Sequence, residues 1–347
     1  MRDISLVDKN FAIKTEIDRE DIVFYDADDA PFEIYGVFRE NGQYRRMPDA
    51  IAKTVSEGVY ELHTHTAGGR VRFKTDSSYI SIHAEVTNDH RGAHFANTGT
   101  SGFDLYIGTN HFGTYRPAMD DRTEFEGTLN FPDGQMREIT INFPCYCGVK
   151  KLYIGLSEAA KVEAPRPYRN EKPVVYYGSS ITQGGCCSRP GRTYQNVVSR
   201  RFNLDYINLG FSGNAKGEDE MIDYIKNLDM SLFVYDYDHN APTPEHLRAT
   251  HEKMFKAIRE KHPLLPIIMM SRPRYNLTPE EEERMQIIYT TYQNALDNGD
   301  ENVYFLSGKE LCALCGDEGT VDGCHPTDLG FYSMATALGG LMEEISF

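Results

Sequence analysis

The pattern of apolar residues changes at about residue 160, and this change constrains the fold more than any other feature of the sequence. Up to that point, short segments alternate apolar and polar residues and are separated by turn-forming residues. Beyond a polar, proline-bearing stretch at 157–173, apolar segments of strand length alternate with helical segments. The two patterns are typical of different sheet architectures. We therefore expect two domains, at residues 1–160 and 172–347.

The first half predicts an antiparallel β-sandwich resembling a jelly roll. Its segments are enriched in β-branched and aromatic residues, alternate with a period of two and are broken by glycine-containing turns. They read PFEIYGVFRE, GVYELHTHTA, GRVRFKT, SYISIHAEV, GFDLYIGTN and EITINF. No helical period is evident among them, so we expect no helix in this domain.

The second half predicts a parallel sheet with helices on both faces. Apolar segments that read as buried strands occur at 173–178, 205–211, 231–238, 265–271 and 302–308, and helical segments at 193–202, 217–228, 243–262 and 278–298 lie between them. A strand followed by a helix, repeated about five times, gives a three-layer α/β/α domain. In such domains the chemistry gathers at the carboxyl ends of the strands.

The stretch YYGSSITQGG, at 176–185, follows the first of these strands and has two possible readings. A phosphate-binding loop needs a lysine directly after its last glycine, or a Gly-x-Gly-x-x-Gly pattern, and neither is present. The α/β-hydrolase elbow needs Gly-x-Ser-x-Gly, and Thr182 stands where the last glycine would be. A reactive serine at the start of a helix remains, and that helix begins either at Ser180 or within GRTYQNVV.

A reactive serine needs a base and an acid that orients the base. The segment DGCHPTDLGF supplies Asp322 and His325, whose spacing of three lets the carboxylate reach the imidazole of its own loop. The loops after the second and third strands offer Gly213 and Asn240 as donors to an oxyanion. Four strand ends thus supply four complementary roles.

These blocks, in this order, resemble those of the SGNH, or GDSL-type, esterases and lipases. The resemblance implies a flavodoxin-like domain in which Ser180 is the nucleophile, with Ser179 in place of the usual aspartate. It carries Gly213, Asn240, Asp322 and His325 over to the later blocks, so that the Ser180 and Gly213 amides and the Asn240 side chain form the oxyanion hole. The sequence departs from the family in the third block, where Gly-x-Asn-Asp is replaced by DHNA.

The first half resembles the β-sandwich that precedes the catalytic domain in a bacterial SGNH subgroup with a Gly-x-Asp-Leu-Tyr motif, here GFDLY at 102–106. Asp104 and Tyr106 of this motif are expected substrate contacts, although Asp104 has the alternative role of tying a turn. Arg272, after the fourth strand, faces the catalytic end and is a third expected substrate contact. A structural ion pair is the alternative role for Arg272.

Two groups of residues suggest metal ligands, but we expect neither to bind metal. Three thiols lie in the same region as His325, yet Cys312, Cys315 and Cys324 are not spaced as two matched Cys-x-x-Cys pairs. His63 and His65 share one face of an expected strand, where ordinary hydrogen bonds are the simpler reading. We therefore expect no metal and no organic cofactor.

Charge and composition limit the partners. The net charge of −16 disfavours nucleic acid and anionic membranes. The N-terminal stretch MRDISLVDKNFAIKT lacks the pattern of a secretory signal, and the odd number of cysteines, seven, suits reduced thiols, so we expect a cytoplasmic protein.

We expect an ester hydrolase that removes a short acyl group, such as acetyl, from a carbohydrate such as an oligosaccharide, or from another small molecule. Acyl transfer to an acceptor other than water and carbohydrate binding without catalysis are the alternatives. The sequence does not indicate an oligomeric state.

Overall fold

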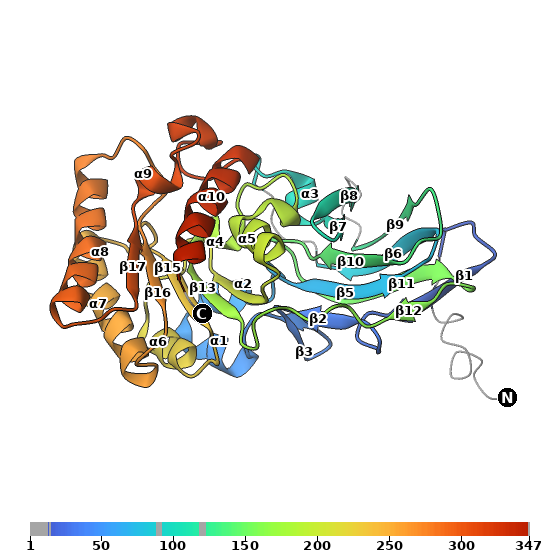
Figure 1. Ribbon diagram of the computed structural model, residues 1–347, viewed down its shortest axis with the longest axis horizontal. Coiled ribbons are helices and arrows are strands. Elements are labelled where there is room, and N and C mark those ends of the chain that lie inside the picture. Colours follow the sequence, from blue (N-terminus) through green and yellow to red (C-terminus); the bar gives the residue numbers. More distant parts are fainter. Residues whose placement is uncertain (1–12, 14, 88–91, 118–122, 346–347) are drawn as a thin grey trace.

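A computed structural model describes residue 13 and residues 15–87, 92–117 and 123–345, and Figure 1 shows two domains lying end to end along its long axis. An antiparallel β-sandwich forms one end, and a parallel sheet with helices forms the other, as expected. Residues 1–12, which contain most of the stretch used to predict the location, lie outside the described residues. Within the described part of the chain, no helix has the length and apolar character that crossing a membrane requires.

The sandwich consists of two antiparallel sheets that enclose one apolar core. The first sheet has the order β1 (Ile22–Asp26), β11 (Val149–Ser157), β6 (Tyr79–Val86), β9 (Glu124–Asn130). The second has the order β12 (Val162–Glu163), β5 (Arg70–Thr75), β10 (Arg137–Asn142), β7 (Phe103–Ile107), β8 (Asn110–Tyr115), and β2 (Glu33–Tyr35) also pairs with β5. A short hairpin of β3 (Phe38–Glu40) and β4 (Gln43–Arg45) lies outside both sheets.

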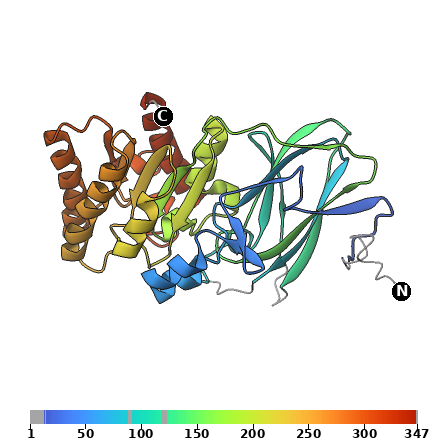
Figure 2. The ribbon, with the colours of Figure 1, turned by 90° about the horizontal axis from the view of Figure 1, so that it is seen from below.

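The expectation that the first half has no helix is wrong. α1 (Asp49–Val55) and α2 (Glu57–Leu62) follow the hairpin, and α3 (Asn97–Thr100) is a single turn. The segment GVYELHTHTA was expected to be a strand, but Ser56 caps α2 by accepting a hydrogen bond from Val59 N at 3.2 Å. Ala52 and Val59 join the core of the parallel-sheet domain rather than that of the sandwich. Figure 2 shows these two blue helices beside the parallel-sheet domain.

The parallel sheet confirms the expected flavodoxin-like topology. Its order is β14 (Tyr206–Gly210), β13 (Val174–Gly178), β15 (Leu232–Asp236), β16 (Ile267–Met270), β17 (Val303–Leu306), which is the order 2-1-3-4-5. Neighbouring residues of β13 point to opposite faces, so that Val175 and Tyr177 enter one core and Val174 and Tyr176 the other. This burial on both faces explains why the strands are continuously apolar.

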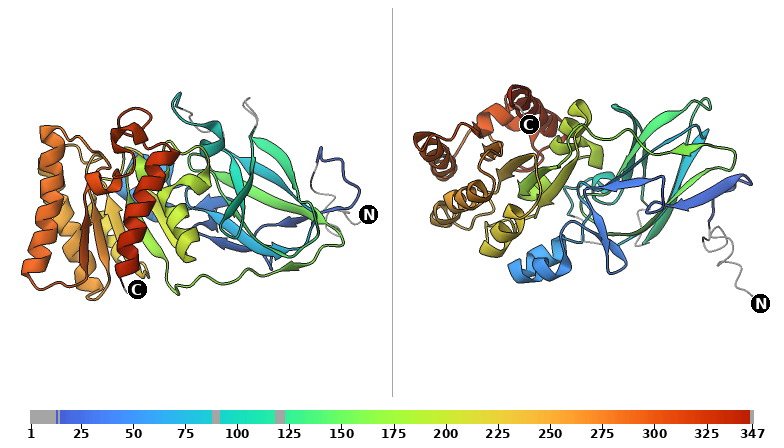
Figure 3. Two further views of the ribbon diagram at one scale, coloured as in Figure 1. Left: turned by 45° about the horizontal axis from the view of Figure 1, so that its top comes forward. Right: turned by 60° about the horizontal axis from the view of Figure 1, so that its bottom comes forward.

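Helices cover both faces of this sheet (Figure 3). One face carries α6 (Asp219–Lys226), α7 (Pro244–Lys261) and α8 (Pro279–Asp297), and the other carries α5 (Tyr194–Phe202), α9 (Gly308–Leu311) and α10 (Asp328–Glu344). Thr243 and Thr278 cap α7 and α8, and a proline follows each of them in the first turn. The strand ends that bear the expected site residues therefore open at one edge of a rigid sheet.

Candidate active site

The segment after β13 places its two serines in different environments. Ser179 is the N-cap of α4 (Ser180–Gln183) and accepts a hydrogen bond from Ile181 N at 3.2 Å. Ser180 is the first helical residue, so of the two expected starts the earlier one is observed. Gly178 is required here, because a Cβ atom at this position would lie 1.8 Å from Asp236 Oδ1.

Ser180, His325 and Asp322 form a continuous chain of hydrogen bonds. Ser180 Oγ lies 2.9 Å from His325 Nε2, and His325 Nδ1 lies 2.8 Å from Asp322 Oδ2. Ser180 is 5% exposed, whereas the Asp322 side chain is 36% exposed. This arrangement can pass the hydroxyl proton of Ser180 to the imidazole while the carboxylate fixes the imidazole orientation.

The loop that carries Asp322 also holds this carboxylate in its ionised form. Asp322 Oδ1 accepts hydrogen bonds from Cys324 N at 3.0 Å and from His325 N at 2.8 Å. Burial opposes ionisation, but the hydrogen bonds from His325 and Cys324 outweigh it and lower the pKa of Asp322 to about 2. The Asp322 carboxylate therefore stays negatively charged at neutral pH, where it can stabilise a protonated His325.

The loops after β14 and β15 carry the two further residues expected to hold an oxyanion. Gly213 has a φ of +69°, a left-handed conformation that favours glycine, and open space surrounds its Cβ position. Asn240 Nδ2 donates to Phe211 O at 3.0 Å, which ties the two loops together and leaves the second hydrogen of the amide for another acceptor. Donation by Gly213 and Asn240 to an oxyanion stays a prediction.

Gln183 links the nucleophile segment to the loop that bears Gly213, a role that sequence reasoning missed. This buried side chain accepts from Ser212 N at 2.9 Å and donates to Cys145 O at 3.2 Å. It also lies 3.0 Å from His65 Nδ1. The position of Gln183 one turn after Ser180 was visible in the sequence, but its partners lie on three distant segments.

The β-sandwich borders the site, which the sequence did not indicate. Tyr146 OH donates to Ser180 O at 3.1 Å, and the Phe95 ring lies 4.7 Å from the Tyr146 ring between centroids. The centroid of the Phe95 ring is also 6.2 Å from that of the His325 ring. Phe95 lies in a loop and Tyr146 in a segment between strands, so no periodic pattern marked either.

The two histidines considered as strand metal ligands do not lie on a strand. His63 is the C-cap of α2, and its Nε2 lies 2.6 Å from Asp49 Oδ1. The Nδ1 atom of His65 lies 3.0 Å from Gln183 Nε2. Among the described residues, Cys312, Cys315 and Cys324 do not form a metal-ligand group with His325 either.

Asp104 and Tyr106 of the GFDLY motif lie in the joint between the two domains. Asp104 is fully buried, and its Oδ2 accepts from Arg189 Nη1 at 3.0 Å and from Gly191 N at 2.9 Å. Tyr106 OH donates to Gly191 O at 3.3 Å and accepts from Arg189 Nη1 at 2.5 Å. Arg189 and Gly191 follow the nucleophile segment, so the motif fastens the sandwich to the catalytic domain. Substrate contact by either residue stays a prediction.

Arg272 makes the ion pair considered as its alternative role. Its Nη1 lies 2.8 Å from Glu281 Oε1, and its Nη2 donates to Gly323 O at 3.4 Å. Gly323 directly follows Asp322, so Arg272 supports the loop of the acid. A direct contact with substrate stays a prediction.

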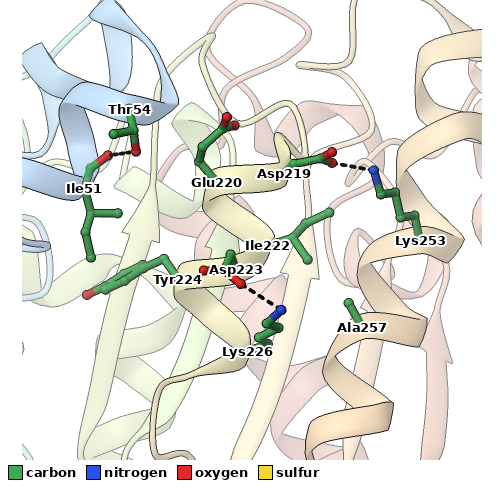
Figure 4. A pocket seen from close by; sticks show the side chains of 10 residues that line it. All are labelled: Ile51, Thr54, Asp219, Glu220, Ile222, Asp223, Tyr224, Lys226, Lys253 and Ala257. Carbon is green, nitrogen blue, oxygen red and sulfur yellow. Dashed lines mark hydrogen bonds and ion pairs between the residues drawn. The ribbon is translucent and has the colours of Figure 1, made fainter.

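A surface hollow of about 580 Å³ lies elsewhere, between α1, α6 and α7. Figure 4 shows two ion pairs among the side chains that line it, Asp219 with Lys253 and Asp223 with Lys226. None of the residues lining it belongs to the Ser180–His325–Asp322 chain. We assign it no part in the chemistry.

Fold and site together define a class of protein. A 2-1-3-4-5 parallel sheet, with a serine, a histidine and an aspartate hydrogen-bonded in series at its strand ends, is the architecture of a three-layer α/β/α serine hydrolase. The family described as GDSL-like lipase/acylhydrolase matches residues 171–343, and the N-terminal domain of SGNH-hydrolase-type esterases matches residues 22–162. The chain belongs to the GDSL-like lipase/acylhydrolase family, whose members hydrolyse ester bonds, and carries the GxDLY domain at its N-terminal side.

Solved structures share this fold. A structure described as a putative GDSL-like lipase from Bacteroides ovatus is 28% identical, with a TM-score of 0.83, and the match covers 93% of this chain and 97% of that one. A salicylyl-acyltransferase from a tetracycline biosynthetic pathway is 19% identical, with a TM-score of 0.78 and coverage of 94% and 98%. An acetyl xylan esterase from Butyrivibrio proteoclasticus is 12% identical, with a TM-score of 0.60 and coverage of 93% and 98%. A search of curated proteins found no match.

Proposed function

We propose that this protein is a serine esterase that removes short acyl groups, such as acetyl, from carbohydrates or other small esters. The observation that carries the proposal is the hydrogen-bonded chain from Ser180 through His325 to Asp322. In the first step, His325 Nε2 takes the proton of Ser180 Oγ while this oxygen attacks the acyl carbonyl. Asp322 orients the imidazole and stabilises its charged form.

The negative oxygen of the tetrahedral intermediate needs hydrogen-bond donors that are in place before the reaction. The proposed donors are the amides of Ser180 and Gly213 and the free N–H of Asn240. His325 then gives its proton to the leaving alcohol, and an acyl-enzyme on Ser180 remains. Water, activated by the same imidazole, releases the acid and restores the serine.

The preference for a carbohydrate ester rests on likeness of fold to carbohydrate esterases, one of which is described as an acetyl xylan esterase. The net charge of −16 also suits a neutral substrate better than an anionic one.

A panel of acetylated oligosaccharides, assayed with the wild type and with Ser180→Ala, tests the proposal. We expect acetate release by the wild type on at least one member and none above background with Ser180→Ala. Equal acetate release by both proteins would show that Ser180 is not the nucleophile. Activity on p-nitrophenyl acetate without activity on any sugar ester would support the esterase activity and contradict a carbohydrate ester as the substrate.

Acyl transfer to another acceptor is the second candidate. The observation that favours it is the approach of Phe95 and Tyr146 from the sandwich, because apolar rings beside Ser180 and His325 lower the access of water to the acyl-enzyme. Product analysis with p-nitrophenyl acetate, with and without added alcohols, separates the two activities. Acetylated alcohol in excess of free acetate would favour the transferase.

A further inference from the structure

A second set of side chains converges on His325. One ligand atom each from His94, Cys186 and His325 lies within 4.8 Å of the other two. It is the one such group of three or more His, Cys, Asp or Glu side chains found among the residues that the structure describes. The serine chemistry proposed above uses only His325 of the three, so the presence of the other two needs a separate explanation.

The three side chains come from different parts of the molecule. His94 is exposed and lies in the loop before α3, in the sandwich domain. Cys186 is buried and lies three residues after α4. The His94 ring lies 5.5 Å from the His325 ring between centroids, so the loop of the sandwich reaches the imidazole of the catalytic domain.

Two imidazoles and one thiolate are a ligand set that suits Zn²⁺. Zinc takes nitrogen at about 2.0–2.1 Å and sulfur at about 2.3 Å in a tetrahedron, which sets neighbouring ligand atoms about 3.3–3.6 Å apart. The observed spread of up to 4.8 Å is wider. Rotation of the exposed His94 side chain can move its ring nitrogens relative to the other two ligand atoms without moving the backbone. Three protein ligands leave the fourth position open to water.

His325 is already oriented as a metal ligand. Its Nδ1 lies 2.8 Å from Asp322 Oδ2, which leaves Nε2 as the nitrogen that faces the cluster. A carboxylate that accepts from the far nitrogen of a histidine is the usual outer partner of a zinc ligand, because it fixes the ring and raises its basicity. The hydrogen bond that prepares His325 as a base therefore also prepares it to bind metal.

We propose that His94, Cys186 and His325 form a Zn²⁺-binding site that holds the enzyme in an inactive state. On binding, Cys186 releases its thiol proton to solvent, and the lone pair of His325 Nε2 passes from the Ser180 hydroxyl to the metal. The imidazole then has no lone pair with which to take the proton of Ser180. The binding site stands on the geometry alone, whereas the inhibition rests on the proposed function.

Binding is tested without any assay of activity. Co²⁺ added to the metal-free full-length protein is expected to give a thiolate-to-cobalt charge-transfer band at one equivalent, and Zn²⁺ is expected to abolish it by displacement. The band should be absent in Cys186→Ser. In His94→Ala the affinity should fall at least about 100-fold, because losing a ligand costs more than losing its outer partner.

Two controls match the ligand variants. Cys315→Ser removes a partly exposed thiol, and His111→Gln removes an exposed imidazole, both outside the cluster. Both controls should bind Co²⁺ like the wild type. A wild type without the band, or a band that survives in both Cys186→Ser and His94→Ala, would overturn the site. Because His94 is exposed, its variant keeps the test valid even if Cys186→Ser does not fold.

Inhibition is measured as the ratio of hydrolysis of p-nitrophenyl acetate with and without Zn²⁺, each protein being compared with itself. At a protein concentration above the dissociation constant for Zn²⁺, the wild type should lose its activity at about one equivalent of Zn²⁺. EDTA should restore the activity. His94→Ala should require at least about 100-fold more free Zn²⁺ for the same inhibition, in line with its weaker metal binding. A cobalt band without any hydrolysis would support the metal site and contradict the esterase activity. Hydrolysis that is insensitive to Zn²⁺, in a protein without the band, would support the esterase activity and contradict the metal site.

Discussion

Ser179 and Ser180 are neighbours in the sequence but have different tasks. The Ser179 hydroxyl is buried and caps α4, whereas the Ser180 hydroxyl faces His325. Ser179→Ala should therefore lower the free energy of unfolding by about 1 kcal/mol and leave most of the esterase activity. Urea unfolding and kcat/KM measured on the same preparation check this. A loss of activity as large as that of Ser180→Ala would contradict the division of tasks.

Asn240 is the least family-like of the proposed site residues, because it stands in DHNA rather than Gly-x-Asn-Asp. If its free N–H holds the oxyanion, Asn240→Ala should lower kcat by about 10²–10³-fold with little change in KM, since the interaction forms only in the transition state. Asn227→Ala, at the exposed end of α6, serves as the control. An unchanged kcat in Asn240→Ala would remove this residue from the oxyanion hole.

The hydrogen-bonded contacts among Ser180, Asp322 and His325 could be predicted from the sequence because Ser180 comes shortly after β13 and the other two residues lie in the loop before α10. A parallel sheet brings such loops to one edge. The positions of Phe95 and Tyr146 beside the site could not be predicted. Their approach to the site depends on how the two domains pack, and no local spacing records that. Asp104 and Tyr106 were recognised as a motif, but their burial in the joint followed only from the structure.

Helix α7 packs a histidine against the parallel sheet. His251 is buried, its ring lies 4.6 Å from that of Tyr235 between centroids, and its Nδ1 lies 3.0 Å from Thr291 Oγ1 on α8. Burial lowers the pKa of His251 to about 3, although the nearby Asp238 carboxylate opposes this. The folded protein therefore keeps this imidazole neutral in mild acid.

This burial predicts a dependence of stability on pH. In the unfolded chain the imidazole binds a proton below about pH 6.5, so the unfolded state gains protons first as the pH falls. Protonation of the His251 imidazole in the unfolded chain should lower the free energy of unfolding by about 2 kcal/mol between pH 7 and pH 5. Urea unfolding at both values measures the difference. His251→Phe should show a correspondingly smaller difference. Equal differences in the wild type and in His251→Phe would contradict the prediction.

The elements of the second domain were predictable because each strand is a buried apolar run and two helices have a clear N-cap followed by proline. α1 and α2 were missed for two physical reasons. They have 7 and 6 residues, which is less than two full turns each, so a helical period cannot establish itself. In addition, their apolar side chains pack on the other domain and not on the sandwich that surrounds them in the sequence.

The buried Asp104 holds the two domains together. Asp104→Ala should lower the free energy of unfolding by about 3–5 kcal/mol, because it leaves Arg189 beside the joint without its carboxylate. Asp133→Ala, which breaks the more exposed pair with Arg137, should change it by less than about 1 kcal/mol. Thermal and urea unfolding measure both variants, and similar losses in the two would contradict the role of Asp104.

The joint also explains how the sandwich takes part in the site. It fastens the segment after α4 to β7, and the same domain presents Tyr146 to the Ser180 carbonyl. We therefore expect the two domains to work as one unit around the nucleophile.

Ser180 is the proposed nucleophile. The most direct measurement is kcat/KM for p-nitrophenyl acetate in the wild type, Ser180→Ala and Ser179→Ala, with circular dichroism to verify folding. Ser180→Ala should lose at least about 10³-fold, since no other hydroxyl lies within hydrogen-bond distance of His325 Nε2 among the described residues, and Ser179→Ala should stay close to the wild type. Activity that survives in a folded Ser180→Ala, or that is lost in Ser179→Ala instead, would contradict the claim.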